Sequence, residues 1–129
     1  MRRREFNAFC ASLPAVTHVV QWGGSDVWKV GGKVFGICWD EEKMPGITFK
    51  ASEISFEILR DMPGLRPAPY LASRGLKWIQ RYDKPGLNLK DMKHYLIESH
   101  RLVSEGLSFK KRVALRLAEK PPKTAKRKG

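Results

Sequence analysis

The sequence has 129 residues, of which 42% are hydrophobic and 10% aromatic, so it fits one folded domain rather than a disordered chain. Its longest apolar runs, such as residues 34–39, are too short for a membrane-spanning helix, which needs about 20 residues. The chain carries 25 Lys and Arg against 13 Asp and Glu, a net charge of +12, and such a surplus indicates a polyanionic partner.

The first segment, residues 2–12, is predicted to be a helix. Its apolar residues recur at spacings of three and four and line one helical face, and Pro14 ends the helix because proline lacks the amide donor. The three arginines at residues 2–4 are not followed by the apolar core of a signal peptide. We therefore expect a cytoplasmic protein without a membrane partner. We also expect a monomer.

Four strands are predicted next, over residues 17–22, 26–30, 33–39 and 47–50. Gly31-Gly32 between the second and third is a two-residue hairpin signal, because primed turns need positive φ angles that glycine adopts at little cost. Short strands joined by turns, without intervening helices, predict an antiparallel meander.

The middle of the chain alternates between regular and irregular segments. Ser52 can cap a helix that runs to about Asp61, with Ile54, Ile58 and Met62 as its predicted inward stripe. Residues 65–70 are expected to be irregular, because they contain two prolines. A fifth strand is predicted over residues 76–82, with Trp78 and Tyr82 on one face and Lys77 and Arg81 on the other.

The clearest helix begins after Asn88, which is a good N-cap, and ends near Gly106. We divide the chain into a folded domain, residues 1–107, and a basic extension, residues 108–129, predicted as a short helix followed by a flexible tail. The extension holds nine basic residues and one acidic residue. The fold class is predicted as α+β, an antiparallel sheet of about five strands with helices covering one face.

Several local motifs resemble the MmcQ/YjbR family. Leu13-Pro14 closes the first helix, Trp22 precedes the hairpin of residues 29–35, and Lys50 ends the fourth strand. The most specific motif is PGLRPAPYL at residues 63–71, followed by Lys77-Trp78. The resemblance covers residues 5–105. It implies a fold similar to frataxin-like proteins and a DNA-binding role in which hairpins act as wings; the basic extension departs from the family pattern.

Basic side chains are the candidate contacts to nucleic acid, because each can neutralise a phosphate without reading sequence. We expect a DNA-binding protein without sequence specificity, with RNA as a possible ligand. The candidate residues are Lys29, Lys33, Lys50, Arg66, Lys77, Arg81, Lys110, Lys111, Arg112 and Arg116.

Other readings stay open at this point. The four tryptophans, residues 22, 28, 39 and 78, are more often core residues at such positions than stacking platforms for bases. Cys10 and Cys38 are expected to be buried thiols, and neither a metal site nor another cofactor is expected. The alternative function is an RNA- or protein-binding accessory module that uses the basic extension; an enzyme is a weaker reading, because no catalytic motif is present.

Overall fold

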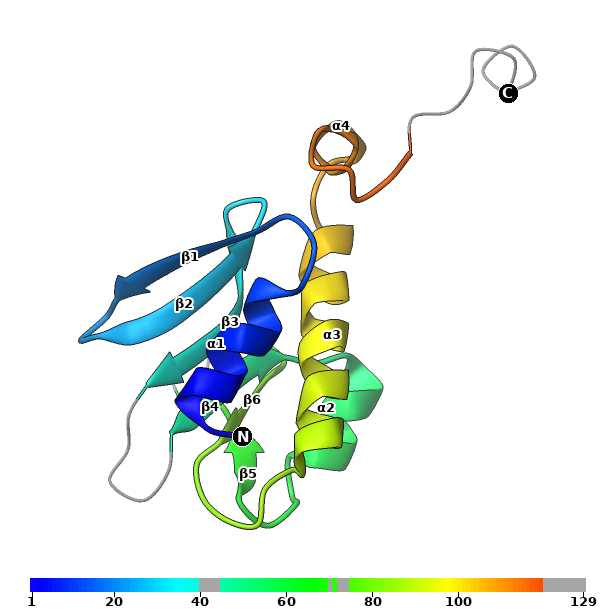
Figure 1. The fold of residues 1–129 in the computed structure, drawn as a ribbon. Coiled ribbons are helices and arrows are strands. Elements are labelled where there is room, and N and C mark those ends of the chain that lie inside the picture. The colour runs from blue at the N-terminus through cyan, green and yellow to red at the C-terminus, as the bar shows by residue number, and fades with distance from the viewer. Residues whose placement is uncertain (40–44, 70, 72–74, 120–129) are drawn as a thin grey trace.

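The computed structural model describes residues 1–39, 45–69, 71 and 75–119. It confirms an α+β fold, in which helices and an antiparallel sheet form two layers (Figure 1). The elements in chain order are α1 (Arg3–Ala11), β1 (Val16–Gln21), β2 (Ser25–Val30), β3 (Lys33–Trp39), β4 (Gly46–Lys50), α2 (Glu53–Leu59), β5 (Leu65–Pro67), β6 (Trp78–Arg81), α3 (Leu89–Glu105) and α4 (Phe109–Ala114).

The sheet has six strands in the order β1-β2-β3-β4-β6-β5, and all neighbouring strands are antiparallel. The expectation that residues 65–70 are irregular is wrong for the first three, which form β5. Because β5 lies at the edge of the sheet, Pro67 can pair with Ile79 without having to donate a ladder hydrogen bond. The amide of Ala68 then donates to the carbonyl of Trp78 at 2.8 Å.

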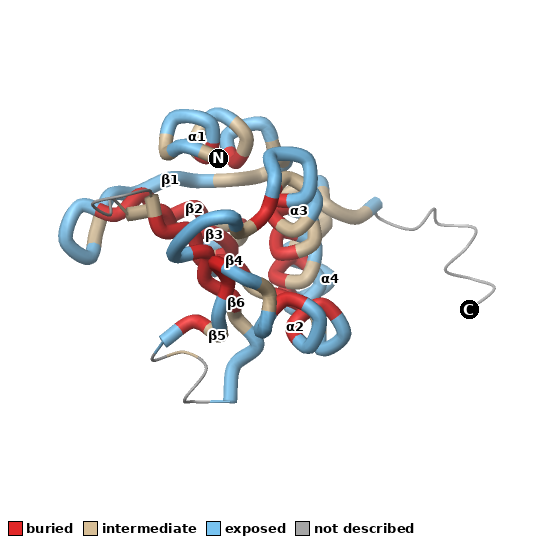
Figure 2. Tube along the Cα trace, turned by 90° about the horizontal axis from the view of Figure 1, so that it is seen from below, coloured by how far each residue is buried: buried red, intermediate tan, exposed pale blue. Residues whose placement is uncertain are grey.

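Helices α1, α2 and α3 cover one face of the sheet, as predicted, and the core lies between the two layers (Figure 2). Phe6 and Cys10 of α1 lie against Gly36 of β3, where a Cβ would come within 3.2 Å of the Phe6 ring. Both cysteines are fully buried, as expected. Burial raises the pKa of the Cys10 thiol, and the neighbouring Cys38 adds to this rise. The fully buried aromatic and aliphatic side chains of the core include Phe6, Phe35, Ile47, Phe49, Ile79, Met92 and Leu96.

Helix α2 buries a different face from the predicted one. Ile54 and Ile58 were expected to point inward, but they are 75% and 57% exposed, while Phe56 and Leu59 enter the core. The helix can bury either Ile54 and Ile58 or Phe56 and Leu59, but not both pairs. Burying Phe56 removes more apolar surface from water than burying an isoleucine. The hydrogen bond from Ser55 Oγ to Glu98 of α3, at 3.2 Å, also fixes this rotation.

The C-terminal helix α4 packs on the turn between β2 and β3. A Cβ on Gly31 would lie 2.5 Å from Leu107 Cδ1 and 3.3 Å from Leu115 Cδ1. Leu107 and Leu115, which flank α4 in the sequence, therefore pack directly against the backbone of Gly31. The short helix expected in the basic extension is thus present, and it contacts the domain; the boundary at residue 107 stays a prediction. The tail from residue 120 lies outside the described residues. No helix in the described ranges has the length and apolar character to cross a membrane.

Candidate functional site

A hollow of about 500 Å³ lies at the end of the sheet where α3 ends. Two predicted phosphate ligands, Lys33 at the start of β3 and Lys50 at the end of β4, line it together with the half-buried Trp78. The remaining lining is apolar apart from backbone, and consists of Val34, Leu76, Val103 and Gly106. The hollow therefore combines two ammonium groups with an aromatic ring and aliphatic side chains.

Lys50 and Trp78 owe their positions to strand pairing. They are direct cross-strand partners at the ends of β4 and β6, so their side chains lie on the same face of the sheet. The backbone of Lys50 is held from the other side, because its amide donates to Ser99 Oγ of α3 at 2.9 Å. Ser99 in turn donates to the carbonyl of Phe35 at 2.6 Å. One buried hydroxyl thus ties the backbones of β3 and β4 to α3.

The hairpin turn brings further cations to the same end of the molecule. The Lys111 ammonium of α4 lies 4.0 Å from the position that a Cβ on Gly32 would take. Gly32 immediately precedes Lys33 in the sequence. Lys29 pairs with Val34, which lines the hollow. We call Lys29, Lys33, Lys50 and Lys111 the basic hairpin surface. Strand pairing and the docking of α4 gather these four lysines from four different elements.

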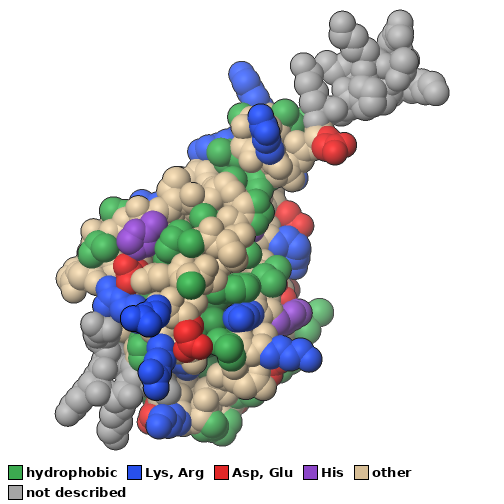
Figure 3. Space-filling model, in the orientation of Figure 1, with side chains coloured by type: hydrophobic (Ala, Val, Ile, Leu, Met, Phe, Trp, Pro, Cys, Tyr) green, Lys and Arg blue, Asp and Glu red, His purple; other side chains and the backbone are tan. Residues whose placement is uncertain are grey.

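Lysine and arginine side chains also gather over α4, as Figure 3 shows at the top of the molecule. Lys110, Lys111 and Arg116 are exposed there. Arg112 turns instead toward α3, where it lines a second hollow of about 280 Å³ with His100, Ser104 and Glu105 among its neighbours. Of the four candidates in the extension, Arg112 is therefore the one directed at the domain.

Arg66 and Lys77 do not line the hollow at Lys33 and Lys50. The Arg66 guanidinium sits 4.2 Å from the centre of the Tyr82 ring and donates to Gln80 at 2.6 Å. The Lys77 ammonium lies 4.8 Å from the centre of the Phe56 ring of α2. Both residues are exposed, but each cation already has an aromatic partner. Of the ten predicted candidates, only Lys33 and Lys50 line the hollow.

Arg81 is a correction to the predicted interface. The alternation along strand 76–82 puts Arg81 on the same face as Lys77, where it is a candidate phosphate contact, but only 2% of the residue is exposed. Its guanidinium donates to the carbonyls of Met1 and Pro45, at 2.8 and 2.6 Å. Burial lowers the pKa of Arg81 below its ordinary value. The face that bears Arg81 is the one covered by helices, because Arg81 pairs with Ile47 and Leu65 in the core. Arg81 is thus unable to contact a surface ligand.

Sequence reasoning did not identify Trp78 and Leu76 as residues of the hollow. Trp78 was assigned to the core, but it is only half-buried, and Leu76 is 42% exposed. A weak signal was present, because Leu76 and Trp78 are two apart in the predicted strand 76–82 and would share a face there. In the structure, β6 begins only at Trp78. The other tryptophans divide between environments: Trp28 is buried, Trp39 is half-buried, and Trp22 is 61% exposed near the β1–β2 turn.

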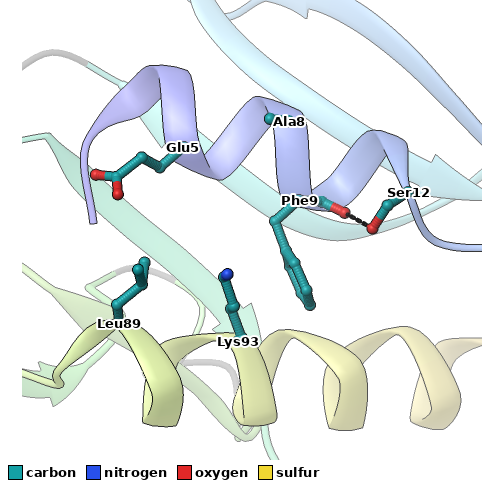
Figure 4. Close-up of a pocket in the computed structure, with 6 residues that line it drawn as sticks. All are labelled: Glu5, Ala8, Phe9, Ser12, Leu89 and Lys93. Carbon is teal, nitrogen blue, oxygen red and sulfur yellow. Dashed lines mark hydrogen bonds between the residues drawn. The ribbon is translucent and has the colours of Figure 1, made fainter.

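A further hollow of about 330 Å³ lies between α1 and α3 (Figure 4). Glu5, Ala8, Phe9 and Ser12 line it from α1, and Leu89 and Lys93 line it from α3. The Glu5 carboxylate already accepts the amide of Arg2 at 2.9 Å, and this hydrogen bond lowers the pKa of Glu5. The Lys93 ammonium lies 5.6 Å from the centre of the Phe9 ring. With one charge of each sign, this hollow is less suited to a polyanion than the hollow at Lys33 and Lys50.

Metal ligands do not cluster in the described part of the chain, where no three His, Cys, Asp or Glu side chains lie close enough to hold an ion. The acidic residues 40–42 lie outside the described residues. The arrangement that remains is a positively charged surface with an aromatic and aliphatic floor, which is suited to binding an anion.

Comparison with known proteins agrees with this architecture. The family model of the YjbR domain matches residues 11–102. The crystal structure of the Deinococcus radiodurans protein DR2400, which carries a DUF419 domain, is similar in fold. Its TM-score is 0.78 at 17% sequence identity, over 95% of this chain and 93% of that chain. No curated protein matches the sequence.

Proposed function

The chain belongs to the YjbR family, and from that premise we propose that it binds nucleic acid through the phosphate backbone, with the basic hairpin surface as the contact. The observation that carries the proposal is the gathering of Lys29, Lys33, Lys50 and Lys111 at one end of the molecule. DNA is the proposed ligand, because the family resemblance implies a DNA-binding role with hairpins as wings.

The mechanism of binding is electrostatic. Lysine ammonium groups act as point charges on phosphates, and their binding releases counterions from the nucleic acid. Such contacts fix affinity and position but carry no direct sequence information. We therefore propose binding without sequence specificity. The role is that of a binding module and not of an enzyme, in keeping with a surface built from cations and apolar side chains.

The test is charge reversal on the basic hairpin surface. Fluorescence anisotropy of a labelled duplex is measured across a salt series for the unmodified chain and for Lys33→Glu, Lys50→Glu and Lys111→Glu. Each variant should weaken binding, and each lost phosphate contact should reduce the salt slope by about 0.9. A chain shortened after Glu119 should keep most of its duplex binding, because it retains α4 and the hairpin.

Lys90→Glu is the matched control. Lys90 is exposed in the first turn of α3, where a glutamate suits the positive end of the helix dipole. It lies at the far end of a 17-residue helix from Gly106, a distance of about 25 Å. If Lys90→Glu weakens binding as much as Lys33→Glu, the attraction is due to overall charge. If binding disappears when residues 120–129 are removed, the folded surface does not bind DNA, and an acidic protein or RNA partner for the tail becomes the better reading.

A further inference from the structure

We propose that the hollow at Lys33 and Lys50 holds an unpaired nucleotide, so that the protein prefers single-stranded nucleic acid to intact duplex. This inference rests on the proposed function and adds to it the form of the ligand. It starts from the lining of the hollow, which is more apolar than a phosphate contact needs. Leu76, which lines the hollow, is 42% exposed, and Trp78 is half-buried.

An intact duplex makes poor use of this lining. Its bases are stacked inside the helix, and it presents mainly phosphates and sugars to a shallow surface. The ammonium groups of Lys33 and Lys50 would contact its phosphates, whereas Trp78 and Leu76 would make few contacts with its stacked bases. An unpaired base, in contrast, has a free π-face, and aromatic side chains bind such faces with little regard to sequence. Trp78 is placed for this role because its strand partner is Lys50, which supplies a cation on the same face.

The lining of the hollow also indicates how the nucleotide is oriented. Lys33 and Lys50 form the basic side, whereas Val103 and Gly106 mark the end of α3. The C-terminal end of a helix carries partial negative charge, so it disfavours a phosphate and tolerates the amino groups of a base. The phosphate is therefore expected at the lysines, and the base toward Trp78, Leu76 and the end of α3. A volume of about 500 Å³ is in the ordinary range for a small-ligand site, about 300–1,000 Å³.

The experiment compares three labelled probes of equal length by fluorescence anisotropy with the full chain: a single strand, a duplex, and an abasic single strand that keeps the phosphates and lacks the bases. The single strand should bind more tightly than the other two. Trp78→Leu should weaken binding of the single strand by about 5- to 150-fold, the range expected for the loss of one stacked base. The same variant should leave the abasic strand nearly unaffected, and Trp78→Phe should restore most of the binding.

Trp22→Leu is the matched control, because Trp22 is an exposed tryptophan that does not line the hollow. If Trp78→Leu proves to be unfolded, Leu76→Ser decides the matter, since Leu76 is exposed enough to be replaced without loss of the core. Leu76→Ser should weaken the single strand more than the abasic strand. Ribose and deoxyribose single strands are tested side by side to distinguish the two sources of an unpaired nucleotide.

The outcomes separate this inference from the proposed function. If Lys33→Glu and Lys50→Glu weaken binding while Trp78→Leu and Leu76→Ser do not, the phosphate-binding function stands and the base-stacking inference is overturned. Equal affinity for the abasic strand and the complete strand overturns it as well. If charge reversal at Lys33 and Lys50 changes binding of none of the probes, the proposed function itself fails.

Discussion

His18 Nε2 lies 2.7 Å from Asp26 Oδ1, and this contact joins the edge strand β1 to β2. Asp26 is buried, and its second oxygen accepts hydrogen bonds from Arg3 and Asn7 of α1. Asn7 in turn accepts the indole N–H of Trp28 at 2.9 Å. One carboxylate thus ties the first helix and the first two strands together, on the side of the sheet that the helices cover.

Asp26→Asn should lower the free energy of unfolding by roughly 2–4 kcal/mol, because it removes a buried charge that compensates Arg3. The asparagine amide also turns a donor toward the Arg3 and Asn7 donors. Urea denaturation followed by tryptophan fluorescence measures the change. Asp61→Asn is the control, since the Asp61 side chain is 87% exposed and its ion pair with Arg60 is long, at 4.0 Å; it should change stability by less than about 0.5 kcal/mol.

The same carboxylate predicts an acid-sensitive contribution to stability. Burial by itself raises the pKa of Asp26, but hydrogen bonds from Asn7, Arg3 and His18 outweigh it and hold the pKa at about 2, below the ordinary value of 3.8. A lowered folded-state pKa gives stability that is fully present above about pH 4 and is lost as the pH falls through about 2. The stability gap between the unmodified chain and Asp26→Asn should therefore narrow in this window. A gap of equal size at pH 7 and pH 2.5 would contradict this assignment.

Ser99→Ala should cost about 1–3 kcal/mol of stability, because it leaves the Lys50 amide without its acceptor and the Phe35 carbonyl without its hydroxyl donor. Ser99 is fully buried, so water does not readily replace it. Thermal unfolding measures the loss. Ser12→Ala is a matched serine control, since the Ser12 hydroxyl donates to the Phe9 carbonyl at 2.6 Å but lies on the surface. A similar loss of stability in Ser99→Ala and Ser12→Ala would mean that the cost of removing a serine hydroxyl does not depend on its burial.

Gly31→Ala and Gly32→Ala separate backbone strain from packing at the hairpin. Both glycines have positive φ angles, of 58° and 80°, so both variants pay about 1 kcal/mol of strain. Gly31→Ala also places a Cβ 2.5 Å from Leu107, so it should cost more and should loosen α4. Hydrogen exchange of the α4 amides is the measurement: protection should fall in Gly31→Ala and stay nearly unchanged in Gly32→Ala.

Much of the fold follows from local patterns in the sequence. Strand alternation and the Gly31-Gly32 turn predict the meander, and Asn88 caps α3 as expected, accepting the Asp91 amide at 2.8 Å. The rotation of α2 does not follow, because Ile54 and Ile58 have the same spacing as the residues that a helix normally buries. Only the tertiary contacts of Phe56 and Leu59 decide between the two faces.

The candidate site was only partly predictable for the same reason. Charge and the hairpin signal point to Lys29 and Lys33, but sequence alone does not bring Lys111 to Gly32, because that contact depends on how α4 docks. The alternation of side chains along a strand also shows which residues share a face, but it does not show which face the helices cover. For this reason alternation groups Arg81 with the surface lysines, although its face of β6 is the one that the helices cover.

Arg81 should therefore act on stability and not on nucleic-acid binding. Arg81→Ala should lower the free energy of unfolding by about 2–4 kcal/mol, because it removes a buried side chain and the donors to the Met1 and Pro45 carbonyls. Arg81→Met should cost less, since it keeps much of the volume and removes a buried charge that has no acidic partner among the described residues. Measured by anisotropy at equal concentrations of folded protein, Arg81→Met should bind the duplex as the unmodified chain does, whereas Lys33→Glu should not. A well-folded Arg81→Met that no longer binds would show that this arginine reaches the ligand.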